Sequence, residues 1–293
     1  MRVGLLDVDS KIPNLALMKI SQWHKHNGDE VEHYMPLARN TYDKVYASKI
    51  FNFSDGSDIQ EEMIVGGTGI DLKISLPTEI EEIDPDYTLY NYPHNIGFAQ
   101  RGCRFNCSFC VVPKKEGKPK SVNTIEKIWT QRSSKFVVLL DNDFFGNPEW
   151  ADRIEEIKGL DLTVNFSQGL NIRIISEKQA QALASVKFSN INNTFKQVTF
   201  AWDQINDEKV IKRGYQRVVD AGIKPYQMQF YVLIGYDTTP EEDMHRVMML
   251  KDWGCDPYAM PYDKTDPYQQ KFVRWVNRRA IFKSCTFEEY KNK

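Results

Sequence analysis

Three of the five cysteines stand close together, and their spacing suits an inorganic cofactor. Cys103, Cys107 and Cys110 lie within eight residues of one another, separated by three and by two residues. Thiolates bind zinc and iron–sulfur clusters well, but a structural zinc site or a ferredoxin-type cluster takes four protein ligands. No fourth cysteine lies nearby. The loop therefore predicts a metal centre that keeps one position open for an outside ligand, which is typical of catalytic sites.

Alternating strand and helix patterns surround this loop. Apolar runs that end in polar residues recur along the chain, with amphipathic segments between them. This rhythm predicts a parallel sheet in an α/β fold, and the chain is too short for eight units. We therefore expect a partial (β/α)6 TIM-like barrel with its active site at the carboxyl ends of the strands. Its expected strands are 96–100, 135–140, 162–166, 197–202, 227–234 and 257–261.

A smaller α/β domain is expected before the barrel. Its strands are expected at 2–9, 30–34, 44–48 and 62–69, with a helix over 14–25, in a Rossmann-like or flavodoxin-like arrangement. Proline and acidic residues then predict a linker. The expected division is a domain at 1–75, a linker at 76–94, the barrel at 95–262 and a C-terminal helical extension at 263–293.

Composition excludes several classes of protein. The chain has 293 residues, of which 41% are hydrophobic and 27% charged, with a net charge of −2. These values are those of a folded globular protein, and no apolar run approaches the roughly 20 residues of a membrane span. A near-neutral charge argues against a protein that simply coats nucleic acid. The cysteines are clustered, whereas those of a disulfide scaffold are spread along the chain, so we expect a reducing compartment. No signal-peptide pattern is present, which predicts a cytoplasmic protein.

The cysteine loop resembles that of the radical S-adenosylmethionine (SAM) superfamily. The pattern is Cys103-x3-Cys107-x-Phe109-Cys110, it follows the first strand of a βα series, and the resemblance covers most of residues 95–262. It implies an oxygen-sensitive enzyme with a [4Fe–4S] cluster on the three cysteines and SAM on the fourth iron. Reduction by a flavodoxin- or ferredoxin-like donor would yield a 5′-deoxyadenosyl radical that takes hydrogen from a substrate.

The resemblance also implies that SAM contacts come from strand ends. A carboxylate after the second strand would accept from the SAM ammonium group, and an arginine after the third would pair with its carboxylate. An acid after the fourth strand would contact the ribose, and the end of the fifth would pack on adenine. The implied cofactor residues are Phe109, Asp141, Asp143, Gln168, Arg173, Asp203, Ile234 and Gly235. Tyr236 and Cys255 are the catalytic candidates.

Two other functions remain open. Residues 1–75 resemble the cobalamin-binding domain of some superfamily members, so one alternative is a cobalamin-dependent methyltransferase. Those domains carry an Asp-x-His-x-x-Gly motif, and its histidine is missing from residues 7–12. Cobalamin is therefore not expected. A metal-stabilised RNA-binding protein without SAM chemistry is the other, because Lys271, Arg274 and Arg278 alternate with aromatic residues on one predicted helix. The enzyme substrate is left open as RNA, a nucleotide or a peptide.

Overall fold

The structure is a computed structural model that describes residues 1–291, and the chain divides into two compact units at residues 94 and 95. The first unit contains a parallel sheet in the order β2-β1-β3-β4. All four strands fall where the sequence predicts them. They are β1 (Arg2–Asp7), β2 (Glu30–His33), β3 (Lys44–Ser48) and β4 (Ile64–Gly66).

Helix α1 (Leu15–His26) packs on this sheet. Its amino end is capped by Asn14, whose side chain accepts hydrogen bonds from the backbone N–H groups of Ala16 and Leu17. Leu17 shares a small apolar core with Leu5. The segment expected as a linker also belongs to this unit, since α2 (Thr78–Glu81) and η2 (Tyr87–Tyr90) both contact α1. The remaining short helix of the unit is η1 (Pro36–Thr41).

The second unit is built on two parallel sheets. One has the order β10-β9-β8-β5 and the other the order β11-β12-β13. Leu170, just after β9, joins them by donating its N–H to the Thr199 carbonyl at 2.8 Å. The six strands predicted from the sequence are all present in these two sheets, which also contain β10. The bounds are β5 (Asn95–Gly97), β8 (Phe136–Leu139), β9 (Thr163–Phe166), β10 (Lys187–Phe188), β11 (Val198–Ala201), β12 (Met228–Ile234) and β13 (Asp256–Pro261).

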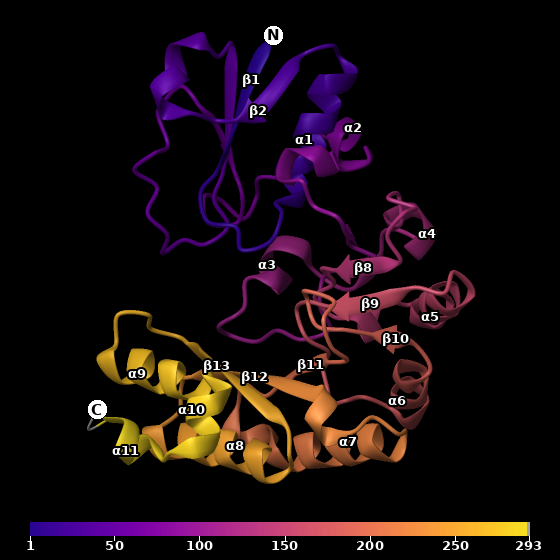
Figure 1. Ribbon diagram of the computed structural model, residues 1–293, viewed down its shortest axis with the longest axis vertical. Helices are drawn as coiled ribbons and strands as arrows, with labels where there is room; N and C mark the ends of the chain where they lie inside the picture. Colours follow the sequence, from indigo (N-terminus) through magenta and orange to yellow (C-terminus); the bar gives the residue numbers. More distant parts are fainter. Residues whose placement is uncertain (292–293) are drawn as a thin grey trace. The chain divides into compact units, whose positions relative to one another are not determined.

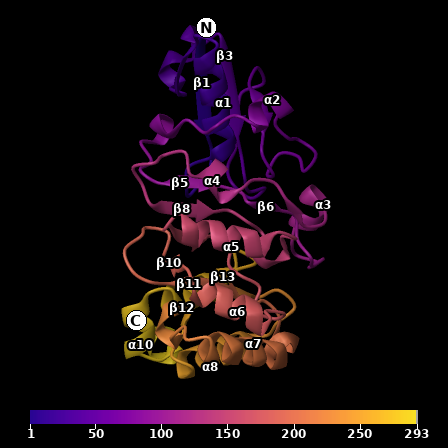
Figure 2. The ribbon, with the colours of Figure 1, turned by 90° about the vertical axis from the view of Figure 1, so that its right-hand side faces the viewer.

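Helices line one face of these sheets. Figures 1 and 2 show α5, α6, α7 and α8 following one another along the same side of the strands, and their apolar faces join the strands in one core. Parallel neighbours with helical crossovers require this arrangement. The long helices are α5 (Trp150–Gly159), α6 (Glu177–Ala184), α7 (Glu208–Asp220), α8 (Pro240–Asp252) and α9 (Pro267–Val276); the shorter ones are α3 (Val112–Glu116), α4 (Ile125–Ile128), α10 (Arg279–Ser284), α11 (Phe287–Lys291), η3 (Phe144–Gly146), η4 (Ile205–Asp207) and η5 (Pro225–Gln227).

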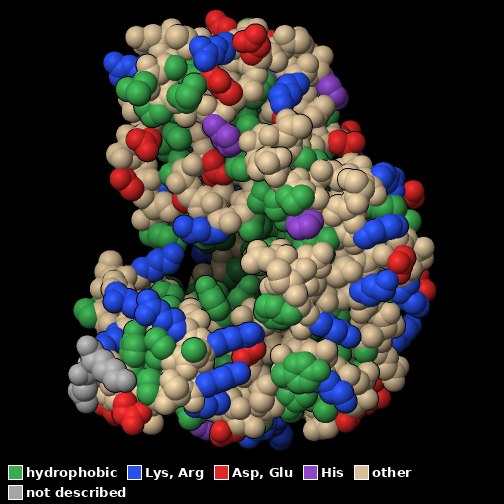
Figure 3. All heavy atoms as spheres, in the orientation of Figure 1, with side chains coloured by type: hydrophobic (Ala, Val, Ile, Leu, Met, Phe, Trp, Pro, Cys, Tyr) green, Lys and Arg blue, Asp and Glu red, His purple; other side chains and the backbone are tan. Residues whose placement is uncertain are grey.

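The C-terminal helices complete this unit. Phe272, Trp275 and Phe287 are nearly fully buried and belong to the same core as the strands. The basic side chains of α9 stay on the outside, and Figure 3 shows Lys and Arg side chains gathered over this part of the molecule. Among residues 1–291, no helix has both the length and the apolar character that a membrane span needs.

Candidate functional site

The three clustered cysteines lie in the loop that connects two short antiparallel strands, β6 (Gln100–Arg101) and β7 (Lys120–Ser121). This pair follows β5, so the loop starts just after the carboxyl end of that strand. Cys103 donates its N–H to the carbonyl of Gly117 at 3.1 Å, which closes the loop on itself. Helix α3 begins two residues after Cys110.

All three thiols are partly accessible to solvent. The N–H of Phe105 donates to the Cys103 sulfur at 3.5 Å, and the Arg173 guanidinium lies 4.0 Å from the Cys107 sulfur. Burial raises the pKa of Cys103 and of Cys110. Within residues 1–291, no three or more His, Cys, Asp and Glu side chains gather closely enough to hold one metal ion, so the thiols share a loop without converging on one point.

The strand ends hold this loop at three places, of which the first is the end of β8. Arg104 donates from Nε and from Nη2 to the two carboxylate oxygens of Asp143, at 2.6 and 2.7 Å. The Arg104 backbone N–H donates to the same carboxylate at 3.2 Å. Asp143 is nearly fully buried, so this is a bidentate charge-assisted contact in a largely desolvated place. Both oxygens of Asp143 are thus engaged by the residue that follows Cys103.

The second contact comes from the end of β9. The Arg173 guanidinium lies over the Phe105 ring, 4.2 Å from its centroid. It also pairs with Asp207 at 2.9 Å. A cation over an aromatic face contributes about 0.5–2 kcal/mol. Arg173 therefore packs against the loop and directs positive charge at the Cys107 sulfur.

The third contact comes from the end of β12. The Tyr236 hydroxyl donates to Ser108 Oγ at 2.7 Å, and its ring meets Phe109 edge to face at a centroid distance of 5.2 Å. Gly235 has a φ of +72°, and a β-carbon there would overlap the Gln269 side chain. Ile234 is fully buried in the core, so this strand end offers only its backbone at that position.

Asp141 is the other acid at the end of β8, and it has one free oxygen. It is 4% exposed, and it accepts the Ala99 N–H at 2.8 Å. Its second oxygen has no hydrogen-bond partner among the described residues. Burial raises the pKa of Asp141 to about 7. A buried carboxyl with an unused oxygen is a common feature of binding sites.

We expect Asp141 to make the protein less stable as pH rises. Its pKa is about 7 in the folded chain against 3.8 for the unperturbed group, so between about pH 4 and 7 the folded state holds a proton that the unfolded state has lost. The free energy of unfolding then falls as pH rises through this window. Asp141→Asn keeps an acceptor for Ala99 and removes the charge. Denaturant titrations should show the variant gaining stability relative to wild type from pH 5 to pH 8, and parallel curves would contradict this.

Two further predicted residues lie near the other strand ends. Asp203, after β11, accepts the Leu233 N–H at 3.3 Å, and burial raises its pKa. Gln168, after β9, is exposed, and its amide lies 3.4 Å from the Ser167 hydroxyl. Both are on the carboxyl side of the sheets, where the loop also lies.

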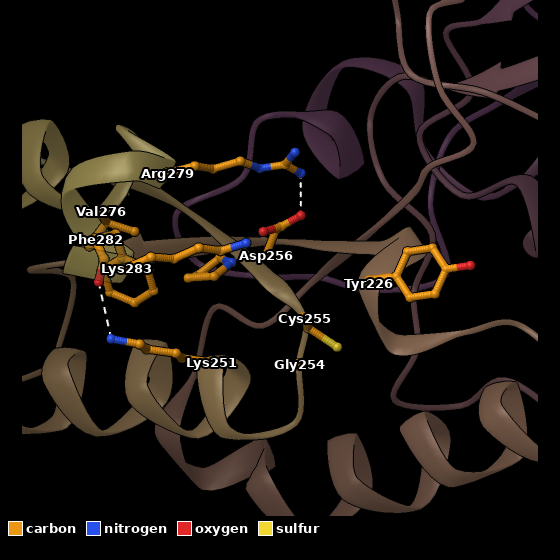
Figure 4. A pocket seen from close by; sticks show the side chains of 10 residues that line it. Tyr226, Lys251, Gly254, Cys255, Asp256, Val276, Arg279, Phe282 and Lys283 are labelled. Atoms are coloured by element: carbon orange, nitrogen blue, oxygen red, sulfur yellow. Dashed lines mark hydrogen bonds and ion pairs between the residues drawn. The ribbon is translucent and has the colours of Figure 1, made fainter.

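Cys255 is not brought to this site. It precedes β13, at the amino end of that strand, whereas Tyr236 follows the carboxyl end of the parallel neighbour β12. The length of β13 separates the two ends by roughly 20 Å. Figure 4 shows Cys255 beside Asp256, in a pocket of about 210 Å³ that Lys251 and Arg279 also line. Burial raises the pKa of Cys255 to about 12, which makes it a poor nucleophile.

The structure adds partners that sequence reasoning missed. They are Arg104, Phe105, Ser108 and Asp207. The first three lie between the cysteines, and this position in the motif was the only available signal. Asp207 gave no such signal, because an acid at this place in the sequence is typical of a helix N-cap.

No protein-family model matches the chain, and none of the curated proteins matches it. The loop and its three contacts therefore carry the functional argument.

Gly102 is required where the loop begins. Its φ is +82°, and a β-carbon would lie 2.3 Å from the Lys118 carbonyl oxygen. Gly102→Ala should therefore displace one side of the loop and cost more than about 1 kcal/mol. We expect the variant to bind less iron after anaerobic reconstitution, as measured by iron content per chain. Gly28→Ala is the matched control for a positive φ, because Gly28 has a φ of +81° in the first unit and nothing lies near its β-carbon. Equal iron loss in both variants would contradict a steric cause.

Proposed function

We propose that this protein is a radical SAM enzyme, with a [4Fe–4S] cluster held by Cys103, Cys107 and Cys110. The observation that carries the proposal is the Cys-x3-Cys-x2-Cys loop at the carboxyl ends of parallel strands, fixed there from β8, β9 and β12. Each thiolate of such a cluster binds a different iron. The cysteines therefore need to share a loop, and need not converge on one point as they would around a single ion.

The order of the strands also supports the proposal. Strands β5, β8, β9, β11, β12 and β13 follow one another through parallel contacts, which is the order of an open (β/α)6 barrel. In the first unit, the order β2-β1-β3-β4 is that of a flavodoxin-like sheet. We propose that this unit is the degenerate cobalamin-binding-like domain. Asp9, in the segment that corresponds to the missing motif, is engaged within the unit, since it accepts the backbone N–H groups of Ile50 and Phe51.

The side chains around the loop have separate roles in this proposal. Arg173 and the Phe105 N–H direct hydrogen-bond donors at cysteine sulfurs, which raises the reduction potential of a cluster bound there. Asp143 holds Arg104, so it positions the loop, and Asp141 keeps a free oxygen that suits the ammonium group of SAM. When cluster and SAM are bound, one-electron reduction supplies a 5′-deoxyadenosyl radical. A flavodoxin- or ferredoxin-like protein would provide the electron, in a reducing compartment such as the cytoplasm.

Iron and sulfide content after anaerobic reconstitution tests the cluster. We expect about four irons per chain in the wild-type protein, and an electron paramagnetic resonance signal of the reduced cluster that changes when SAM is added. Cys103→Ala, Cys107→Ala and Cys110→Ala should each lose the cluster. Cys285→Ala is the matched control, because Cys285 lies in the C-terminal helical region and its sulfur lies 3.5 Å from the Ile281 carbonyl. Tightly bound zinc with no iron, or a cluster that survives all three substitutions, would contradict the proposal.

A further inference from the structure

Four tyrosines line one face of the β12–β13 pair. Tyr231 and Tyr258 stand directly opposite each other in the ladder, with ring centroids 5.7 Å apart. Tyr236 and Tyr262 follow the ends of these strands, with centroids 4.7 Å apart. Tyr258 is 41% exposed and Tyr262 is 55% exposed. We call these four residues the tyrosine face.

The tyrosine face is the side of the sheet that the helices leave uncovered. Side chains alternate along a strand, and Phe230, Val232 and Ile234 on the other face are fully buried in the core that includes Val247 of α8. Large exposed aromatic groups on an uncovered sheet face mark a binding surface, because rings of this size are otherwise placed in a core.

The same face adjoins the cysteine loop. Tyr236 contacts both Ser108 and Phe109, so the row of rings continues from Tyr262 through Tyr236 into the loop. A ligand that lies on the tyrosine face thus reaches the place where the proposed chemistry occurs.

Exposed lysines follow the cysteines in the segment that closes the cysteine loop. Lys114, Lys118 and Lys120 are exposed within ten residues of Cys110, and Tyr236 contacts this loop at Ser108 and Phe109. Asp237 and Asp263 are exposed and directly follow two of the tyrosines, so we expect an anionic group to be bound by the lysines rather than beside these acids. Planar rings beside lysines are the usual combination for binding bases together with their phosphates.

We propose that the tyrosine face stacks the nucleobase of the substrate, whose phosphate lies toward the lysines after the cysteine loop. This inference rests on the proposed function and names the substrate class of that site. A free nucleotide and single-stranded RNA share the chemistry of a planar base attached to phosphate. Stacking on an aromatic ring tolerates every base, so the face selects nucleic-acid chemistry rather than one sequence.

Fluorescence anisotropy of a labelled short oligouridine, with reconstituted protein, tests the inference. The double variant Tyr258→Leu/Tyr262→Leu should bind at least about tenfold more weakly, since each stacked base contributes strongly to affinity. The double variant with phenylalanine at both positions keeps the rings and should bind within about twofold of wild type. Tyr226→Leu is the matched control, because Tyr226 is 70% exposed at the opposite end of the strands (Figure 4). Thermal melting checks that each variant is folded.

Competitors distinguish the two sources of the base. Displacement of the probe by uridine monophosphate assigns the face to a free nucleotide, and displacement by unlabelled oligouridine alone assigns it to an RNA strand. Unchanged binding by the leucine variant, or displacement by polyphosphate as effective as by RNA, would overturn the inference. Protein that cleaves SAM but binds neither ligand overturns only this inference. Protein that binds RNA through the tyrosines but takes up no iron overturns only the proposed function.

Discussion

Replacing Arg246 with methionine should lower the free energy of unfolding by about 3–5 kcal/mol. Arg246, in α8, is fully buried and pairs with Asp243 of the same helix. It also donates to the carbonyl of Trp202 at 2.9 Å and to that of Leu233 at 2.7 Å. Methionine fills similar volume but leaves the Asp243 carboxylate and two carbonyl groups in the core with fewer donors, and that desolvation cost is not recovered.

Arg246 matters to the site because it joins the ends of β11 and β12. Asp243 also accepts the Gly235 N–H at 3.0 Å, next to Tyr236. Urea denaturation at neutral pH measures the loss in stability. Arg213→Met, at an exposed position of α7, should change stability by less than about 0.5 kcal/mol. A similar small change for Arg246→Met would show that the buried pair does not hold these strands.

Replacing Asp143 with alanine should release the cysteine loop from β8. The Arg104 guanidinium would lose both carboxylate contacts and the buried acid that neutralises it, at a cost of about 2 kcal/mol. This cost corresponds to an ordered loop that is populated about thirtyfold less, relative to the disordered loop. We therefore expect weaker cluster binding, measured as iron retained per chain during titration with a chelator.

A matched substitution separates this effect from a general loss of charge. Glu155→Ala removes the exposed carboxylate that pairs with Lys158 on α5, and it should leave iron retention unchanged. Asp143→Asn keeps one acceptor for Arg104 and should fall between alanine and wild type. Full iron retention in Asp143→Ala would contradict the positioning role.

Much of the fold could be predicted because its signals are local. Each parallel strand is an apolar run that ends in polar residues. The start of α8 is predicted by a capping box formed by Thr239 and Glu242, with Pro240 between them, and the structure contains this capping box. The sequence over 124–133 predicts a helix of that length, but α4 ends at Ile128. Asn95 explains this difference, since its side chain takes the N–H of Gln131 at 2.7 Å and draws the chain out of the helix. No local pattern reveals such a contact.

The residues of the candidate site could be predicted more readily than the contacts between them. The spacing of the three cysteines is visible in the sequence, and so is their place after a strand. The contacts that hold them are not, because Arg104 and Asp143 are 39 residues apart and Tyr236 and Ser108 are 128 apart. Asp143 illustrates the limit: as a strand-end acid it resembles a cofactor ligand, and only its bidentate contact with Arg104 gives it a positioning role. Pro148 shows a similar limit for the fold. A proline there predicts the first turn of a helix, but α5 begins two residues later, at Trp150.

Reductive cleavage of SAM by the reconstituted protein tests the central claim most directly. Wild-type protein carrying a full cluster should convert SAM to methionine and 5′-deoxyadenosine in the presence of dithionite, and Cys285→Ala should do the same. Cys107→Ala should form no 5′-deoxyadenosine above the protein-free background. Equal product from Cys107→Ala, or no product from wild-type protein that carries four irons per chain, would contradict the assignment of radical SAM chemistry to this loop.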